Sequence, residues 1–127
     1  MSAVKFEGFE VRKIIFENNM SGNVDLDFKF SYGVRYIEEV SKCIGSLTIN
    51  IIDKENNGIF NLEVVIEGIY SYDKSNEKEL IHKETLKELY PYARTLITNL
   101  TANAGLSPLV LPMIDADSME VVEGQPQ

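Results

Sequence analysis

The chain has 127 residues, enough for one domain with one hydrophobic core, and we treat residues 1–127 as a single domain. Its 20 acidic and 12 basic side chains leave a net charge of −8 at pH 7, which argues against nucleic acid as a partner, because nucleic-acid binders present basic patches. A lone cysteine excludes an intrachain disulfide. No apolar run approaches the roughly 18 residues that a membrane helix needs, so we expect a cytoplasmic protein without membrane insertion.

Residues 5–72 show the period-two alternation of β-strands. The first segment, "KFEGFEVRKIIFEN" (5–18), breaks its alternation at Gly8 and again at Ile14 and Ile15. A glycine inside a strand is typical of a bulge, so we expect a bent edge strand. In the second segment, "VDLDFKFSY" (24–32), alternate apolar residues are predicted to form one buried face: Val24, Leu26, Phe28, Phe30 and Tyr32.

Two further segments continue this alternation, "SLTINIID" (46–53) and "GIFNLEVVIEGIYSY" (58–72). The Asn-Asn-Gly sequence within residues 54–58 tolerates positive φ and predicts a hairpin turn between them. Four strands joined by short polar loops predict an antiparallel meander with one dry face and one wet face.

A helical region follows the strands. Residues 75–89 are rich in helix formers, but their apolar positions are sparse, so they predict either a loose helical turn or an exposed connection. Pro91 suits the first position of a helix, and apolar residues three or four apart predict an amphipathic helix over 90–104. Gly105 stands where a left-handed C-terminal cap belongs. The fold class is therefore α+β.

The segment after Gly105, "LSPLVLPMI" (106–114), is apolar, and its two prolines forbid further helix. Its apolar side chains either pack over the sheet as core or stay uncovered for a partner. We expect Leu106 and Val110 to be buried in either case. Residues 115–127 are predicted to form a flexible acidic tail.

No residue pattern predicts catalysis. The one histidine, His82, lacks partners that would complete a catalytic or metal site, and we expect it on a solvated face. Cys43 is expected to be a buried or idle thiol. "DADSME" (115–120) lacks the glycine and the later glutamate of a calcium loop. We therefore expect no enzyme, no catalytic residues, no metal and no cofactor.

The stretch "LYPYARTLITNLTANAGLSPLVLPMI" (89–114) resembles the SecB family of export chaperones, in which a similar Pro-Tyr-Ala-Arg segment opens the long helix and a crossover with Pro and Leu follows it. "EGIY" (67–70) falls where the family has a comparable sequence at the end of its fourth strand. The resemblance implies a four-stranded antiparallel sheet backed by one long helix, with the family's C-terminal segment shortened. It also implies a homotetramer, a dimer of dimers.

The function that the resemblance implies is that of an ATP-independent holdase, which binds unfolded or precursor polypeptides in apolar grooves and passes them to the SecA motor. Glu17 and Glu63 match acidic positions of the family's SecA-docking patch, whereas Lys13 and Asn61 depart from it. The residues that we expect to line the client groove lie beside the edge strand and the crossover. They are Phe6, Phe9, Val11, Tyr92, Leu109, Leu111 and Met113.

Other functions stay open at this point. A SecB-like protein can instead protect an antitoxin in a toxin-antitoxin-chaperone system, and the altered docking patch and short C-terminal segment favour this alternative. A small α+β ligand-binding or enzymatic domain would have one enclosed cavity between sheet and helix. A purely structural dimerisation module would leave no apolar surface free after assembly.

Overall fold

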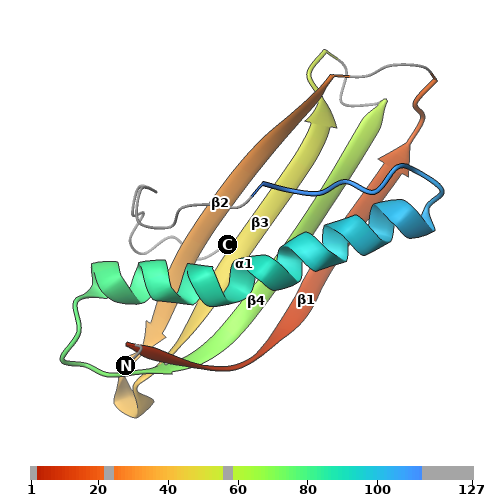
Figure 1. Ribbon diagram of the computed structural model, residues 1–127. Helices are drawn as coiled ribbons and strands as arrows, with labels where there is room; N and C mark the ends of the chain where they lie inside the picture. Colours follow the sequence, from red (N-terminus) through yellow and green to blue (C-terminus); the bar gives the residue numbers. More distant parts are fainter. Residues whose placement is uncertain (1–2, 22–24, 56–58, 113–127) are drawn as a thin grey trace.

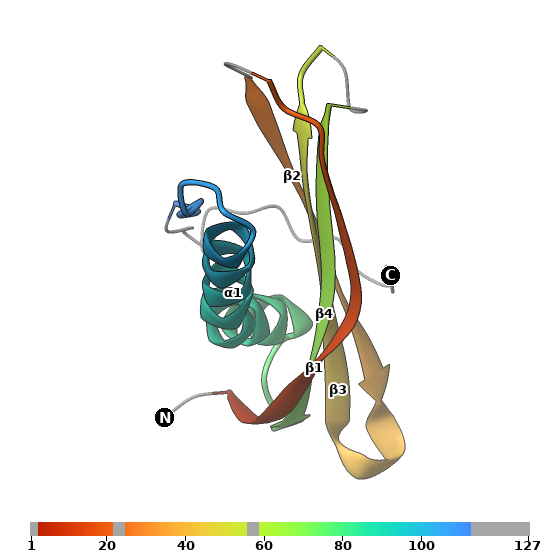
Figure 2. The ribbon, with the colours of Figure 1, turned by 90° about the vertical axis from the view of Figure 1, so that its right-hand side faces the viewer.

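The computed structural model describes residues 3–21, 25–55 and 59–112. Four strands form one antiparallel sheet, and one long helix crosses one of its faces (Figures 1 and 2). The elements are β1 (Val4–Asn18), β2 (Leu26–Ile37), a short 3-10 helix (Glu38–Val40), β3 (Lys42–Asp53), β4 (Phe60–Tyr72) and α1 (Lys78–Asn103). The α+β fold predicted from the sequence, a four-stranded antiparallel sheet backed by a long helix, is confirmed.

The order of the strands in the sheet is β1-β4-β3-β2. Strands β2, β3 and β4 form the predicted meander, but β1 pairs with β4 and not with β2, which gives a Greek-key order. The prediction of a simple meander was therefore wrong for the first strand. Alternation identifies the face to which a side chain points, and it does not identify the neighbouring strand.

Two bulges bend β1. The register with β4 shifts between Phe6 and Gly8 and again between Val11 and Lys13, so that Glu7 and Arg12 are the extra residues. Gly8 has φ 147, a value that favours glycine, which confirms the bulge predicted there. The bulges change the side-chain parity twice along the strand.

As a result, five apolar residues of β1 share the face that α1 covers, which we call the inner face, whereas Ile15 lies opposite Glu63 on the other face. Each of the five lies opposite an inner-face position of β4. They are Phe6, Phe9, Val11, Ile14 and Phe16.

The hydrophobic core lies between this inner face and α1. It is built from the alternate residues of β3 and β4 and from one stripe of the helix, all of them fully buried. The largest contributions come from Leu47, Ile49, Ile51, Phe60, Leu62, Ile66, Tyr70, Ile81, Leu86, Leu89 and Ile97.

Helix α1 is longer than the sequence predicted. It begins at Lys78 and contains Pro91 in its interior, so residues 78–89 are neither a loose turn nor an exposed connection. Ile81 and Leu86 are buried against the sheet, and this packing outweighs the roughly 3 kcal/mol that an interior proline costs. The two halves of the helix point in different directions (Figure 2), as expected for a proline kink. In the described part of the chain, no helix has both the length and the apolar character to cross a bilayer.

The C-terminus of α1 is capped as predicted. Gly105 has φ 85, in the left-handed region. The Gly105 N–H donates to Ala102 O (3.2 Å) and the Leu106 N–H donates to Thr101 O (3.1 Å), which is the hydrogen-bond pattern of a Schellman motif. This cap turns the chain back toward the sheet.

Buried hydroxyl groups link the helix to the sheet. The Tyr32 hydroxyl donates to Thr85 Oγ1 (2.5 Å), and the Tyr70 hydroxyl donates to Thr85 O (2.7 Å). His82 was predicted on a solvated face, but it is only 6% exposed and its ring packs edge-on against Tyr32 at 5.0 Å between centroids. The prediction was wrong because it placed residue 82 outside a packed helix.

The inner face of β2 is only partly covered. Tyr32 is buried as predicted, but Phe28 and Phe30 are 39% and 37% exposed. Their predicted burial was wrong because β2 is an edge strand and α1 crosses the sheet without covering that end of it (Figure 1). Val24 and the turn at residues 56–58 lie outside the described residues, as does the predicted tail at 115–127.

Adjacent alanine substitutions in β3 test the packing over this sheet. A Cβ added at Gly45 would overlap the Tyr32 hydroxyl, so Gly45→Ala is expected to reduce the free energy of unfolding by about 1–3 kcal/mol. Ser46 is the matched control, because in the described residues its buried Oγ has no hydrogen-bond partner. We expect Ser46→Ala to stay within about 0.5 kcal/mol of the wild type or above it in urea unfolding. Equal losses in both variants would contradict this account of the packing.

Candidate binding surface

The segment after the helix, residues 106–112, is here called the crossover segment. It has no regular secondary structure and runs back along the C-terminal half of α1 (Figure 1). Helix side chains hold its backbone: the Thr98 hydroxyl donates to Leu109 O (2.7 Å), and the Tyr90 hydroxyl donates to Pro112 O (2.6 Å). The position of this segment is therefore set by α1.

Burial along the crossover segment differs from the prediction at two residues. Leu111, predicted to line the client groove, is 1% exposed and belongs to the core, whereas Val110, predicted to be buried, is 67% exposed. Side chains of an extended chain alternate, so the segment can turn only one of these neighbours toward the sheet. Leu106 and Leu109 are half-buried against the core. Met113 lies outside the described residues.

Three predicted groove residues form one aromatic cluster on the inner face. The ring centroids of Phe9 and Tyr92 are 4.5 Å apart, those of Phe6 and Tyr92 are 5.3 Å apart, and those of Phe6 and Phe9 are 6.5 Å apart. Phe9 and Tyr92 are 40% and 42% exposed, so the cluster presents ring surface to solvent. Phe6 and Phe9 share this surface because of the bulge between them.

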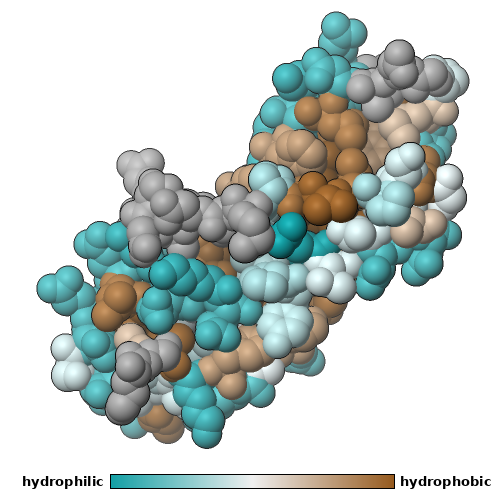
Figure 3. All heavy atoms as spheres, viewed as in Figure 1, coloured by the Kyte–Doolittle hydropathy of each residue, from teal (hydrophilic) through white to brown (hydrophobic). Residues whose placement is uncertain are grey.

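Exposed aliphatic side chains continue this surface along β1. Val11, a predicted groove residue, is 40% exposed, and Ile14 is 46% exposed. At the opposite edge of the sheet, the Phe30 ring lies 6.2 Å from that of Tyr90. Figure 3 shows hydrophobic side chains gathered over the end of the sheet that α1 leaves uncovered. The inner apolar surface, as we define it, consists of Phe9, Val11, Ile14, Phe28, Phe30, Tyr92 and Val110.

Sequence reasoning missed four members of this surface: Ile14, Phe28, Phe30 and Val110. Ile14 lies where the alternation of the first strand is broken, so the pattern did not assign it to a face. Phe28 and Phe30 alternate as a buried strand face does, and nothing in that pattern shows whether a helix covers them. Val110 lies between two leucines in a segment without a periodic signal. Only the path of α1 and of the crossover segment separates the covered residues from the exposed ones.

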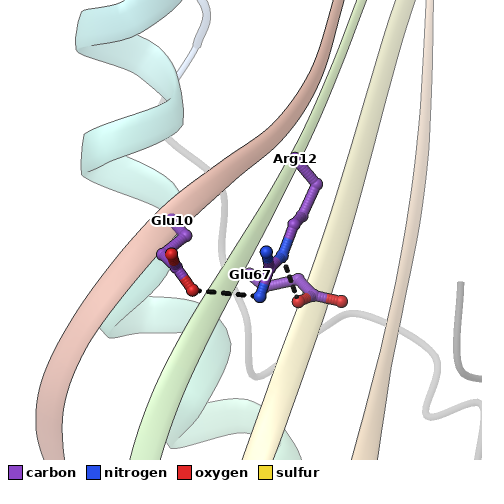
Figure 4. A network of polar contacts seen from close by, with 3 residues as sticks. All are labelled: Glu10, Arg12 and Glu67. Atoms are coloured by element: carbon purple, nitrogen blue, oxygen red, sulfur yellow. Dashed lines mark hydrogen bonds and ion pairs between the residues drawn. The ribbon is translucent and has the colours of Figure 1, made fainter.

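The opposite, outer face of the sheet carries the two predicted docking residues. The Glu63 carboxylate pairs with Lys13 Nζ at 3.0 Å, and Glu17 is exposed near the end of β1. Arg12, the extra residue of the second bulge, pairs with both Glu10 (2.9 Å) and Glu67 (2.8 Å) (Figure 4). Most of the acidic groups of this face are therefore already bound to cations of the same chain.

Strand register extends this charge balance to the whole outer face. Among the described strand residues, six acidic and six basic side chains point to it, so the formal charge of this part of the face is zero although the chain carries −8. The acids are Glu7, Glu10, Glu17, Asp27, Glu63 and Glu67, and the bases are Lys5, Arg12, Lys13, Lys29, Arg35 and Lys42. The sequence therefore predicted an acidic docking patch on a face whose charges are balanced.

The pKa values of Glu7 and Cys43 are shifted in the folded chain. Hydrogen bonds from Lys42 (2.8 Å) and Ser71 lower the pKa of the Glu7 carboxyl. Burial raises the pKa of the Cys43 thiol to about 12. Cys43 is fully buried, so the prediction of a buried thiol is confirmed.

Comparison with known proteins identifies the class. A family model described as "Preprotein translocase subunit SecB" matches residues 3–122, and the chain belongs to this family. "Protein-export protein SecB" of Caulobacter vibrioides (strain NA1000 / CB15N) is 33% identical over 66 residues, 50% of this chain and 40% of that protein. The protein of the same name from Erythrobacter litoralis (strain HTCC2594) is 27% identical over 99 residues, 74% of this chain and 54% of that protein. The chain matches about half the length of these relatives.

Solved structures share the fold. The SecB-like chaperone of Mycobacterium tuberculosis, solved in complex with a ChAD peptide from the HigA1 antitoxin, superposes with a TM-score of 0.70 at 16% identity, covering 89% of this chain and 88% of that one. A protein of unknown function from Streptococcus agalactiae has a TM-score of 0.52 at 11% identity, with 87% and 97% coverage. At 16% and 11% identity, these two likenesses concern the fold alone.

The pH dependence of stability tests the Glu7 contacts. The pKa of the Glu7 carboxyl is lowered from 4.5 in the folded chain, so these contacts stabilise the fold above pH 4.5 and lose this effect as the pH falls through the lowered pKa. We expect Glu7→Gln to lower the thermal unfolding midpoint at pH 7 and to match the wild type in strong acid.

Glu17→Gln is the control for this experiment, because it removes the same charge from the same strand. Glu17 takes part in none of the ion pairs formed by the described residues. Its midpoint should follow the wild type at every pH. A Glu7→Gln deficit that persists unchanged in acid would show that the Glu7 contacts do not act through charge.

Proposed function

We propose that this protein is an ATP-independent chaperone, a holdase, which binds unfolded or precursor polypeptides on the inner apolar surface. The observation that carries the proposal is the exposure of Phe9, Tyr92 and Val110 on one face of a well-packed protomer. Burying apolar area gains about 25 cal/mol per Å² whatever the client sequence. Such a surface therefore binds any apolar segment that a folded protein would bury in its core.

The chemistry of the surface suits varied clients. It combines aromatic rings with branched aliphatic side chains and includes no charged residue, so it offers contact area without a specific polar pattern. The net charge of −8 lies elsewhere on the molecule, where it favours basic clients. The same charge opposes aggregation of a protein that exposes apolar surface. Binding of this kind needs no cofactor and no bond chemistry.

The assembly and location that we propose follow the family. Four copies, arranged as a dimer of dimers in the cytoplasm, would place several inner apolar surfaces on one particle. Weak contacts with one long client would then add through effective concentration.

We propose export as the purpose of this binding, with the client held for transfer to the SecA motor. Glu17 and Glu63 are the candidate docking residues on the outer face. The Lys13–Glu63 pair (3.0 Å) competes with a basic partner for Glu63, which weakens such docking in this chain.

Protection of an antitoxin is a second candidate, and the neutral outer face favours it. A chaperone dedicated to one client in the cytoplasm has no need of an acidic surface for a motor. The likeness to the Mycobacterium tuberculosis chaperone extends to the fold alone at 16% identity, so the charge balance of this chain carries the argument.

The role of the aromatic cluster in client binding can be tested by charge substitution. Phe9→Asp/Tyr92→Asp places two charges in the cluster, and we expect about tenfold weaker binding of a permanently unfolded, fluorescein-labelled polypeptide in anisotropy titrations without nucleotide. Val40→Asp/Leu80→Asp is the matched control, because both side chains are apolar and exposed, at 59% and 43%, but lie outside the inner apolar surface. Equal affinity of the two double variants would place client binding elsewhere.

The export role can be tested on the outer face. Lys13→Glu frees Glu63 and makes the face acidic, so we expect purified SecA to bind this variant at least about fivefold more tightly than the wild type at low salt. Lys29→Glu makes the same charge change near the other edge of the face and should have a smaller effect. Absence of SecA binding by the wild type and by both variants would contradict the export role and leave protection of an antitoxin.

A further inference from the structure

One face of α1 carries four polar side chains in a row. Tyr90, Arg94, Thr98 and Thr101 follow one another at intervals of four, four and three residues, and this spacing places them on the same side of a helix. Tyr90 and Thr101 belong to the buried side of the helix, and Arg94 and Thr98 are half-buried beside it. We call this set the backbone ladder.

Every bond from the ladder to the crossover segment reaches a backbone atom. Arg94 Nε donates to Leu111 O (3.0 Å), between the bonds that Thr98 makes to Leu109 O and Tyr90 makes to Pro112 O. The Thr101 hydroxyl accepts the Leu109 N–H at 2.9 Å and donates to Ile97 O and Thr98 O within the helix. The ladder thus provides both a donor and an acceptor for Leu109 and donors for the carbonyl groups beyond it.

Bonds to backbone atoms do not depend on the sequence that is bound. Any extended polypeptide presents the same carbonyl and N–H groups at the same spacing. The side-chain requirement is small, because Leu111 alone among the described residues after Gly105 is fully buried. A leucine or another apolar side chain at that position of a client would fill the same place.

The crossover segment itself has the character of a client. It is extended, carries no charge, and leaves Val110 67% exposed. It is not a strand of the sheet, so no ladder of backbone bonds to a neighbouring strand holds it. It also contributes Val110 to the inner apolar surface, and Tyr90, which binds the last carbonyl of the segment, contacts Phe30 of that surface.

We infer that the backbone ladder is a binding site for the backbone of an extended apolar polypeptide, and that the crossover segment occupies this site as a tethered competitor until a client displaces it. The inference rests on the proposed holdase function and extends it by naming the binding mode. A segment tethered within a few residues competes at an effective concentration on the order of millimolar. Only clients with enough apolar surface to engage the inner apolar surface as well would displace it, so folded proteins and short polar segments are excluded.

The test is to fasten the crossover segment to the helix. Asn99 and Pro108 are both exposed, lie outside the inner apolar surface and are the sequence neighbours of Thr98 and Leu109, which bond at 2.7 Å, so Asn99→Cys/Pro108→Cys introduces two accessible thiols close to each other at little cost to packing. A short bismaleimide joins them. The native thiol, Cys43, is fully buried and stays unmodified. The control is the same double variant with both thiols capped by N-ethylmaleimide, and circular dichroism and size-exclusion chromatography verify that both forms keep the fold and assembly.

Reduced, carboxymethylated and fluorescein-labelled lactalbumin serves as the unfolded probe in anisotropy titrations. We expect the capped form to bind it like the wild type and the cross-linked form to bind at least fivefold more weakly. Equal affinity of the two forms would overturn the inference while leaving the holdase function in place. Absence of binding by the wild type and the capped form would instead contradict the holdase function, and the inference would fall with it.

Discussion

The structure depends on the fact that one helix must cover a sheet larger than itself. The 26 residues of α1 extend about 39 Å, but a helix is only about 10–12 Å wide. The 15 residues of β1 extend about 50 Å, and the helix crosses the strands rather than following them. Apolar inner-face residues at one end of the sheet therefore remain without a covering helix. The exposed phenylalanines and aliphatic side chains of β1 and β2 are a consequence of this geometry.

The polar groups of α1 position the crossover segment, which is the part of the chain left to cover the sheet after the helix. The cap at Gly105 reverses the direction of the chain, and the threonines, arginine and tyrosine that follow one side of the helix hold the returning backbone. Thr85 has a comparable role deeper in the protomer, where it receives the two tyrosine hydroxyls from the sheet. Hydrogen bonds thus determine where the helix and the crossover segment lie, and the apolar contacts supply most of the stabilisation.

Local patterns in the sequence predicted the strands, the bulge at Gly8 and the helix cap, because each of these depends on nearby residues alone. Phe6, Phe9 and Tyr92 are three of the seven residues that the resemblance to a known family led us to expect in the client groove, and they lie together in the structure. Local patterns failed where coverage by a distant element decides the outcome. Phe28 alternates as a core residue does, and His82 lies among lysines and glutamates as a surface residue does, but the path of α1 exposes the first and buries the second. The predictions for Leu111 and Val110 were the reverse of what the structure shows. They failed because an extended segment between prolines has no partner strand that would indicate the direction of its side chains.

The two extra residues in β1 also affect how this protein is compared with its relatives. Glu7 and Arg12 each shift the strand by one position, and the second shift returns Ile14 and Phe16 to the side of the helix. A relative with a straight strand here must have one residue fewer for each bulge that it lacks. An alignment that keeps the strand free of gaps would then match inward residues of one protein with outward residues of the other. Such an alignment would lower the apparent sequence identity within the first strand, so structural superposition is the proper basis for assigning equivalent positions there.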